Sequence, residues 1–436
     1  MPKAAFHTLG CKLNFAETST LERQFIDRGF ELVPFGESAD VCLINTCSVT
    51  ERANRECRQV IRRALRSSRA PFVIVTGCYA QLEPEDVASI PGVDLILGAR
   101  EKFRIFDLAP SFEKVRYPRV CVSPIREADD FGPAFSTSAS DRTRAFLKIQ
   151  DGCDYQCSFC TIPLARGVSR SQPVGITLEQ ARTLVGQGFK EIVLTGVNVG
   201  DYGKKVGSNL LRLIKDLTRV EGLERIRISS IEPNLLSDEI IEFVAMSPNM
   251  CRHFHIPLQS GDDEVLGLMR RRYTTKQYRS LIERVRERIP DCGIGVDVIA
   301  GFPGETETHF QKTYSFLNDL PVSYLHVFTY SERPDTPAAS FDDVVEPRMR
   351  FRRNEMLRML GQKKKHAFHV SMLGSVADVL LESDVHDGYR TGFTGNYIRV
   401  KVPVTAADEN TIVRARLISS GEDMCMAEVL EGNAAA

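Results

Sequence analysis

The segment "DGCDYQCSFC", residues 151–160, places three cysteines, Cys153, Cys157 and Cys160, within eight residues. The next cysteine along the chain is Cys251, so no fourth thiol is available locally. A structural zinc site is closed by four ligands, usually in paired knuckles. Three thiolates can instead bind three irons of a four-iron cluster and leave the fourth iron open to an outside ligand. The spacing therefore predicts an iron–sulfur cluster with one open position, and an odd zinc site or an accidental cysteine-rich loop is the alternative.

Length and composition restrict the class of protein. The chain has 436 residues, with 56 Lys and Arg against 57 Asp and Glu, so we expect two or three domains and any RNA contact to come from local basic patches. There is no apolar run of about 18 residues and no apolar signal core at the N-terminus, which predicts a cytoplasmic protein without a membrane span. Twelve cysteines in a reducing compartment favour metal binding or catalysis over disulfides.

Strand and helix patterns alternate through the first hundred residues. The apolar strand-like runs followed by a cysteine are "AAFHTLG" (4–10), "VCLINTC" (41–47) and "PFVIVTGC" (71–78). Such alternation predicts an α/β domain with a Rossmann- or flavodoxin-like parallel sheet. Because ligands bind outside the carboxyl ends of parallel strands, Cys11, Cys47 and Cys78 are expected at one edge of the sheet. The alternative is that they are ordinary buried cysteines, which are common at strand ends.

The remainder of the chain divides by pattern. Residues 1–110 form the predicted N-terminal domain, and residues 111–143 lose periodicity and predict a linker. Six strand–helix units in residues 144–368 predict a partial (β/α) barrel. Short β-type runs separated by turns in residues 369–432 predict a small all-β barrel.

The cysteine spacing, with the aromatic Phe159 before the third cysteine, resembles the signature of the radical S-adenosylmethionine (SAM) superfamily. The resemblance implies a [4Fe-4S] cluster whose open iron is chelated by SAM, and cleavage of SAM to a radical by one electron. Cluster potentials span roughly −700 to +450 mV, so the reaction requires a low-potential electron donor as a partner. Enclosure by a barrel would keep the radical from water.

Further barrel motifs match the superfamily in order: "TGVNVG" (195–200), "SSIEP" (229–233) and "GVDVIAGFPGE" (295–305). The resemblance assigns SAM contacts to Phe159, Thr195, Gly196, Asn198, Ser230, Glu232, Gly295 and Gly301. The last two glycines are expected to let the backbone approach the adenine closely, although each motif alone is more typical of an ordinary turn. "HIPLQSG" also matches, but His255 is given no role and no residue is identified as certainly catalytic.

The segments "TLGCKLNFAET", "INTCSVTERA" and "TGCYAQ" resemble the N-terminal domain of the methylthiotransferases, a family that ends in a small RNA-binding β module called TRAM. The resemblance implies that the three strand-end cysteines hold a second [4Fe-4S] cluster, whose open iron carries the sulfur to be inserted. It also implies two SAM molecules per product, one as methyl donor and one as radical source, and a sulfur donor as a partner. Asn14, Glu17, Asn45 and Thr46 are expected to shape this pocket or to form turns at the strand ends.

The substrate class is indicated by the first motif. "GCKLN" (10–14) resembles the methylthiotransferases that act on N6-threonylcarbamoyladenosine, whereas the isopentenyladenosine enzymes tend to show "GCQMN" and the class that modifies a ribosomal-protein aspartate "GCPKN". The resemblance implies a transferase that converts N6-threonylcarbamoyladenosine at position 37, in the anticodon stem-loop of tRNA, to its 2-methylthio derivative. The other two substrates, or a non-enzymatic metal-bearing RNA-binding protein, are the alternatives. In "YSERPDTPAA" (330–339) Asp335 stands where glycine is more usual.

Basic and aromatic residues provide the predicted RNA contacts. The basic runs are residues 270–272 and 363–365, with Arg399 and Lys401 in the tail. Phe393 and Tyr397 place aromatic rings near these last two. Phosphate attraction and base stacking are the usual means of holding single-stranded RNA, although a strand with one core face and one solvated face would give the same pattern.

Overall fold

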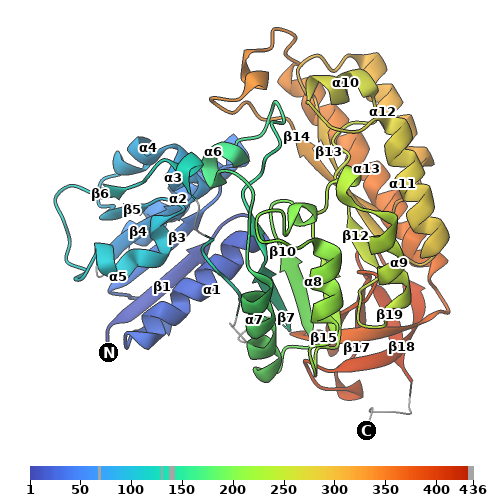
Figure 1. The fold of residues 1–436 in the computed structure, drawn as a ribbon, viewed down its shortest axis with the longest axis horizontal. Coiled ribbons are helices and arrows are strands. Elements are labelled where there is room, and N and C mark those ends of the chain that lie inside the picture. The colour runs from blue at the N-terminus through green and yellow to red at the C-terminus, as the bar shows by residue number, and fades with distance from the viewer. Residues whose placement is uncertain (67–69, 129–130, 137–142, 431–436) are drawn as a thin grey trace.

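The computed structural model describes residues 1–66, 70–128, 131–136 and 143–430. Parts of the predicted linker, and the last two residues of the predicted third domain, lie outside the described residues. The N-terminal sheet domain, the open barrel and the small C-terminal barrel follow one another along the chain (Figure 1). No helix in the described ranges is both long and apolar enough to cross a membrane.

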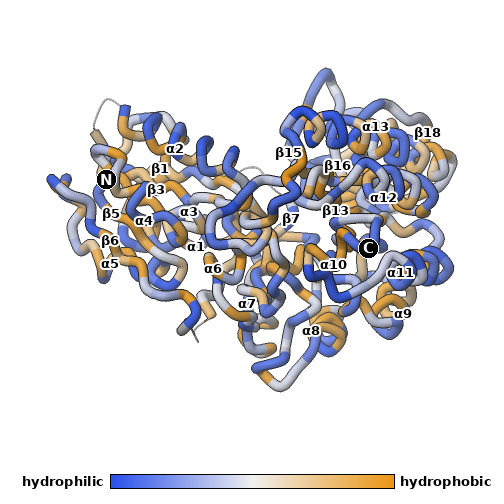
Figure 2. The backbone as a smooth tube through the Cα atoms, turned by 90° about the horizontal axis from the view of Figure 1, so that it is seen from above, coloured by the Kyte–Doolittle hydropathy of each residue, from blue (hydrophilic) through white to orange (hydrophobic). Residues whose placement is uncertain are grey.

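The N-terminal domain is a parallel sheet with the strand order β2-β1-β3-β4-β5-β6. Its strands are β1 (Lys3–Thr8), β2 (Glu31–Val33), β3 (Val41–Thr46), β4 (Phe72–Gly77), β5 (Leu95–Leu97) and β6 (Arg119–Cys121), and its helices are α1 (Lys12–Asp27), α2 (Glu51–Leu65), α3 (Cys78–Leu82), α4 (Pro84–Ala88) and α5 (Ile105–Leu108). The order reverses between β1 and β3, as in flavodoxin-like sheets, so this fold prediction is confirmed. Figure 2 shows the strands of this sheet as largely hydrophobic segments. This composition fits their environment, because β3 and β4 are buried on both faces.

Two strands of this sheet were not predicted from the sequence. β2 and β6 have three residues each and lie at the two edges, and so short a run carries no usable alternation. Because β6 pairs with β5, the sheet extends beyond residue 110 into the segment predicted as a linker.

The central domain is an open barrel of six parallel strands. They are β7 (Arg144–Lys148), β10 (Glu191–Thr195), β11 (Arg225–Ile228), β12 (His253–His255), β13 (Gly293–Ala300) and β14 (Tyr324–Thr329), and the helices around them are α7 (Val174–Gly186), α8 (Leu210–Leu217), α9 (Asp238–Met246), α10 (Asp263–Leu268), α11 (Thr275–Arg288) and α12 (Glu307–Asp319). Isolated bridges such as Ser230–His255 join the sheet β11-β10-β7 to the sheet β12-β13-β14. A short ribbon of β8 (Gln150–Asp151) and β9 (Arg170–Ser171) flanks α6 (Ile162–Arg166). The six predicted units are confirmed.

The two faces of the barrel strands differ in chemistry. Alternate residues such as Ala145, Leu147 and Ile192 belong to the apolar core under the outer helices. The residues between them on the same strands are largely polar, including Arg144, Lys148, Glu191, Arg227, His253, His255, Asp297 and His326. A barrel filled only for stability is packed with branched apolar side chains, so this polar inner face indicates a site.

The C-terminal domain is a closed five-stranded barrel in the order β15-β16-β17-β19-β18. The strands are β15 (Val376–His386), β16 (Tyr389–Thr394), β17 (Arg399–Pro403), β18 (Ile412–Ser420) and β19 (Cys425–Val429), and α13 (Pro347–Ser371) leads into them. The domain packs on the first residues of the barrel strands: Arg225 donates to the carbonyl of Phe393 at 3.0 Å and Arg227 to that of Gly395 at 3.0 Å. The predicted small β module is confirmed.

Candidate active site

The first cysteine trio lies at the carboxyl edge of the N-terminal sheet. Cys11 precedes α1, Cys47 follows β3, and Cys78 begins α3 after β4. Burial first, and then the charges of Cys78 and Cys11, raise the pKa of Cys47 to about 12. Gly10 has φ +99°, and a Cβ atom there would lie 2.9 Å from the sulfur of Cys47, so only glycine leaves this space open. The topology thus gathers the three thiols as predicted.

The second trio lies on the loop between β8 and α6. The backbone N–H of Tyr155 donates to Cys153 Sγ at 3.4 Å, and Arg271 donates to Cys157 Sγ at 3.1 Å. Burial, followed by the charges of Cys157 and Cys153, raises the pKa of Cys160 to about 12. Two of the three thiols therefore already accept hydrogen bonds from the protein.

The chemistry of the two donor sets fits an iron–sulfur cluster. A buried thiol with a raised pKa is neutral near pH 7, but a bound cation deprotonates a coordinating thiol outright. Among residues 1–66, 70–128, 131–136 and 143–430, no group of three His, Cys, Asp or Glu side chains is arranged to hold a single metal ion. In a four-iron cluster each thiolate binds a different iron, so three cysteines at one sheet edge or on one loop can hold three of the four irons.

Gln150 organises the predicted SAM contacts at the end of β10. Its Oε1 accepts the backbone N–H of Asn198 at 2.9 Å, and a Cβ atom on Gly196 would lie 2.8 Å from the same oxygen. The side-chain oxygen of Asn198 in turn accepts the backbone N–H of Glu232 at 3.3 Å. Gly196, Asn198 and Glu232 are therefore held together across the ends of β10 and β11.

Two buried hydroxyls at the same strand ends have no partner among the described residues. They are Thr195 Oγ1 and Ser229 Oγ. Leaving a buried polar group unsatisfied costs about 1–3 kcal/mol, so such groups commonly mark the position of a ligand or water. A polar cofactor such as SAM fits this place.

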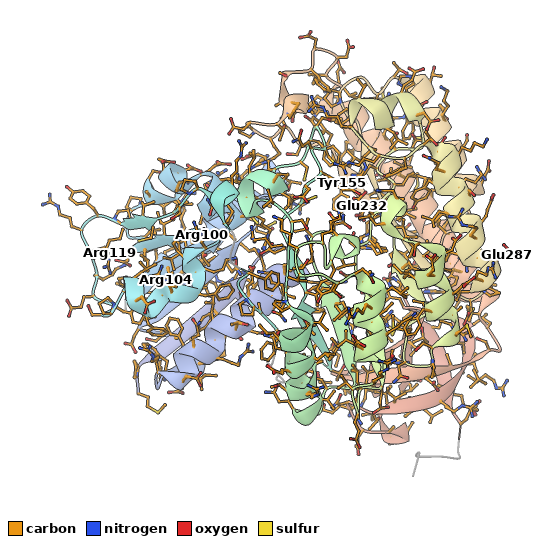
Figure 3. All side chains as sticks on the ribbon, in the orientation of Figure 1. Arg100, Arg104, Arg119, Tyr155, Glu232 and Glu287 are labelled. Atoms are coloured by element: carbon orange, nitrogen blue, oxygen red, sulfur yellow. The ribbon has the colours of Figure 1, made fainter. Side chains whose placement is uncertain are left out.

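Arg271 connects this region to the second cysteine trio. Its guanidinium forms a salt bridge with Glu232 and also donates to Cys157 Sγ. Figure 3 shows Glu232 beside Tyr155, which belongs to the cysteine loop. Arg271 was expected among the RNA-binding residues 270–272, but its side chain is almost fully buried. In the structure its guanidinium faces Cys157.

Three residues assigned to SAM have other contacts in the structure. The ring of Phe159 packs edge-to-face on Phe302 with 6.2 Å between centroids. The space beside Gly295 is filled by the ring of Tyr324, 2.3 Å from an added Cβ, and the space beside Gly301 by the side chain of Arg350 at the same distance. The side of each glycine on which a Cβ atom would lie is therefore occupied by one of these two side chains, and the contact of both glycines with the adenine stays a prediction.

A buried ion network joins the two trios. Glu17 of α1 pairs with Lys102 at 2.6 Å, Lys148 at 3.1 Å and Arg166 at 3.0 Å, and Arg166 also pairs with Asp151 at 3.0 Å. Burial alone would raise the pKa of Glu17, but the charges of Arg166, Lys102 and Lys148 hold it well below its usual value. With Arg170, which lies 3.7 Å from Asp151, four cations thus face two carboxylates at the junction of the sheet domain and the barrel.

This network reaches both sets of cysteines. Asp151 lies two residues before Cys153, and the charge of Arg166 lowers the pKa of Cys78 against the larger effect of burial. Arg166 also donates to the side-chain oxygen of Asn14 at 2.6 Å. The surplus positive charge favours an anionic group at the first trio, as thiolates bound to a cluster would be. Neither Arg166 nor the two lysines that pair with Glu17 were singled out from the sequence.

The other two residues expected at this pocket make hydrogen bonds inside the sheet edge. Asn45 donates to the carbonyl of Asn14 at 3.0 Å, and Thr46 donates to the carbonyl of Thr76 at 2.5 Å. These bonds fix the loops that carry the cysteines.

The loop after β14 contacts the N-terminal domain. Arg333 donates to Ser48, the neighbour of Cys47, at 2.7 Å and to Glu83 at 3.1 Å. Asp335 in this loop has φ +62°, a left-handed conformation that Asp and Asn tolerate better than most residues. Asp335 therefore adopts a left-handed backbone conformation that glycine also adopts readily.

A cleft of about 770 Å³ lies between β14, α13 and the C-terminal barrel. Its lining includes the aromatic residues Tyr324, Phe393 and Tyr397 and the basic residues Arg358, Lys365, His366 and Arg399. Stacking rings beside cations suit single-stranded nucleic acid. Within the run 363–365, Lys364 instead donates to the carbonyls of Asn318 and Leu320 at the end of α12, so the run does not act as one patch.

Comparison with known proteins separates the N-terminal sheet domain from the barrel. Residues 147–317 match the model of the radical SAM superfamily, and residues 3–98 match an uncharacterized protein family, UPF0004. The chain is 39% identical, over 97% of its length and 95% of the relative, to "Threonylcarbamoyladenosine tRNA methylthiotransferase MtaB" of Bacillus subtilis. The chain belongs to the radical SAM methylthiotransferase family. Family membership implies a [4Fe-4S] cluster and SAM as cofactors.

Two further relatives carry the same substrate name and a different one, respectively. A relative of Aquifex aeolicus with the MtaB name is 37% identical over 92% of this chain and 96% of its own. A "tRNA-2-methylthio-N(6)-dimethylallyladenosine synthase" of Cereibacter sphaeroides is 33% identical over 95% of this chain and 98% of its own. Among solved structures, the radical SAM methyltransferase TsrM of Kitasatospora setae covers 78% of this chain and 77% of its own, with a TM-score of 0.60 at 16% identity, which supports the fold alone.

Proposed function

We propose that this methylthiotransferase converts N6-threonylcarbamoyladenosine at position 37 of tRNA to its 2-methylthio derivative. The observation that carries the proposal is the arrangement of two trios of thiols, one from each domain, on either side of one buried ion network. This arrangement supports a second [4Fe-4S] cluster at Cys11, Cys47 and Cys78 beside the radical SAM cluster at Cys153, Cys157 and Cys160. The substrate assignment rests on the names of the relatives with 34–39% identity and on the "GCKLN" motif.

The chemistry explains why two separate sites are needed. The hydrogen on adenine C2 is not activated, so an ordinary base cannot remove it, and a radical route is required. SAM, when bound, supplies both the radical and the methyl group, with one molecule used for each. Thr195, Gly196, Asn198, Ser230 and Glu232 would hold the cofactor at the ends of β10 and β11.

The RNA would lie against the cleft beside the C-terminal barrel. Phosphate attraction to Arg358, Lys365 and Arg399 supplies affinity that falls with salt, and Phe393 and Tyr397 provide aromatic faces. The reaction also needs a low-potential electron donor and a sulfur donor as partners. A cytoplasmic location, where tRNA is modified, accompanies this proposal.

Nucleoside mass spectrometry of tRNA tests the proposed function. Total tRNA from cells with and without the gene is digested, and the 2-methylthio nucleosides are quantified. Loss of the 2-methylthio threonylcarbamoyl nucleoside, restored by the wild-type gene but not by a Cys153→Ala variant, supports the proposal. Loss of the dimethylallyl product instead assigns the other tRNA substrate, and an unchanged profile contradicts the tRNA function.

A further inference from the structure

Lys12 is a cation in an unfavourable position. It follows Cys11 and is the first residue of α1, where a positive charge opposes the helix dipole. No acidic residue stands in the first turn of that helix. Lys12 is half-buried, and its ammonium has no hydrogen bond or ion pair with any residue of the described ranges. A residue that violates local stability rules without compensation is a candidate for function.

The ammonium lies near polar residues of the barrel and of the C-terminal domain. It is within electrostatic reach of Tyr397, Arg144 and Glu191, and of His253 in β12 and His326 in β14. Lys12 therefore links the cysteine edge of the sheet domain, where it follows Cys11, to the polar residues of the barrel strands.

The carboxylates of these barrel strands are already paired. Glu191 forms a salt bridge with Arg227 at 2.7 Å, and Asp297 contacts His255 at 2.7 Å. Arg144 is likewise paired, with Glu382 at 2.9 Å. Among the described residues, Lys12 thus presents a positive charge that forms no ion pair, because the nearby carboxylate of Glu191 is paired with arginines.

The proposed substrate has the missing anion. Methylthiolation at C2 requires the base to approach the first cysteine trio, which includes the neighbour of Lys12. The threonylcarbamoyl group on N6 ends in a carboxylate, whereas a dimethylallyl group is uncharged. A lysine ammonium on its flexible four-carbon stem can follow such a group as a point charge.

We propose, on the basis of the function proposed above, that Lys12 binds the carboxylate of the threonylcarbamoyl group and is the residue that selects this substrate. A charge-assisted hydrogen bond of this kind corresponds to about 10- to 100-fold in affinity. A contact with an RNA phosphate is the competing role, and it would act on every RNA alike.

The test measures binding of two synthetic anticodon stem-loops to the reconstituted chain by fluorescence anisotropy. One carries N6-threonylcarbamoyladenosine and the other the same nucleoside with the carboxylate converted to a neutral carboxamide. The wild-type chain should prefer the acid about 10- to 100-fold, Lys12→Gln should bind both equally, and Lys12→Arg should regain part of the preference. Lys276→Gln, on the exposed face of α11, is the matched control and should behave as wild type.

Two results would overturn the assignment. If wild-type protein binds acid and carboxamide equally, Lys12 does not read the carboxylate, whether or not the variants fold. If Lys12→Gln weakens both RNAs by the same factor, the contact is with phosphate. Product analysis with the wild-type enzyme separates this inference from the proposed function: an enzyme that methylthiolates the threonylcarbamoyl stem-loop keeps its function even if the Lys12 assignment fails.

Discussion

Replacing Glu17 by Gln removes the central anion of the ion network that joins the sheet domain to the barrel. Glu17 is fully buried, and Lys102, Lys148 and Arg166 all lie within 3.1 Å of its carboxylate. The substitution preserves the volume of the side chain, so no cavity is created. It leaves these three cations and Arg170 opposite Asp151 alone, and removal of one partner from a buried ion pair costs about 3–5 kcal/mol.

Hydrogen exchange of the α1 amides measures this cost locally, which matters because a chain of several domains does not unfold in one step. At about 1.4 kcal/mol per factor of ten, Glu17→Gln should speed exchange in α1 by about two to three and a half orders of magnitude. The control is Glu31→Gln, which breaks an exposed pair with Lys3 at 3.9 Å and should cost less than about 1 kcal/mol. Equal exchange rates in the two variants would refute the view that the network holds the domains together.

Two further predictions concern the barrel and its loops. Burial alone would raise the pKa of Glu191, but Arg227, Arg225 and Arg144 lower it to about 2 from its ordinary 4.5. Ionised Glu191 therefore contributes about 3 kcal/mol to the free energy of unfolding, which is present above pH 4.5 and lost as the pH falls towards 2. Amide exchange in β11 should speed up through this acid transition. If the same transition persists in Glu191→Gln, the assignment to Glu191 is contradicted. Because Asp335 has φ +62°, Asp335→Gly should leave the melting temperature unchanged or raise it. Asp335→Val should instead lower the stability by about 1–2 kcal/mol. A valine variant as stable as wild type would contradict the left-handed conformation of this loop.

The three-part architecture could be predicted because its signals are local or periodic. Apolar runs alternating with helical segments predicted the sheet domain and the barrel, and the topology of a parallel sheet was enough to bring Cys11, Cys47 and Cys78 together. The trio at residues 153–160 needed only its spacing. Short edge strands such as β2 and β6 gave no pattern that could be recognised.

The junction between the domains could not be predicted, since it depends on contacts across long stretches of chain. Lys102 and Lys148 are single lysines in mixed segments, and their partner Glu17 lies 85 and 131 residues away. Arg271 belongs to a basic run that predicted contact with RNA. In the structure it is buried, forms a salt bridge with Glu232 and donates a hydrogen bond to Cys157. Gly295 and Gly301 were read from a motif, and only the tertiary structure reveals the side chains beside them.

Each cysteine trio is proposed to hold its own cluster with one open iron. Iron and zinc are to be quantified after anaerobic reconstitution in wild-type protein and in two triple Cys→Ala variants, one for each trio. We expect about eight irons in the wild type and about four in each variant, with little zinc. A wild-type chain with about four irons, or with zinc in place of iron at either trio, would contradict the central claim.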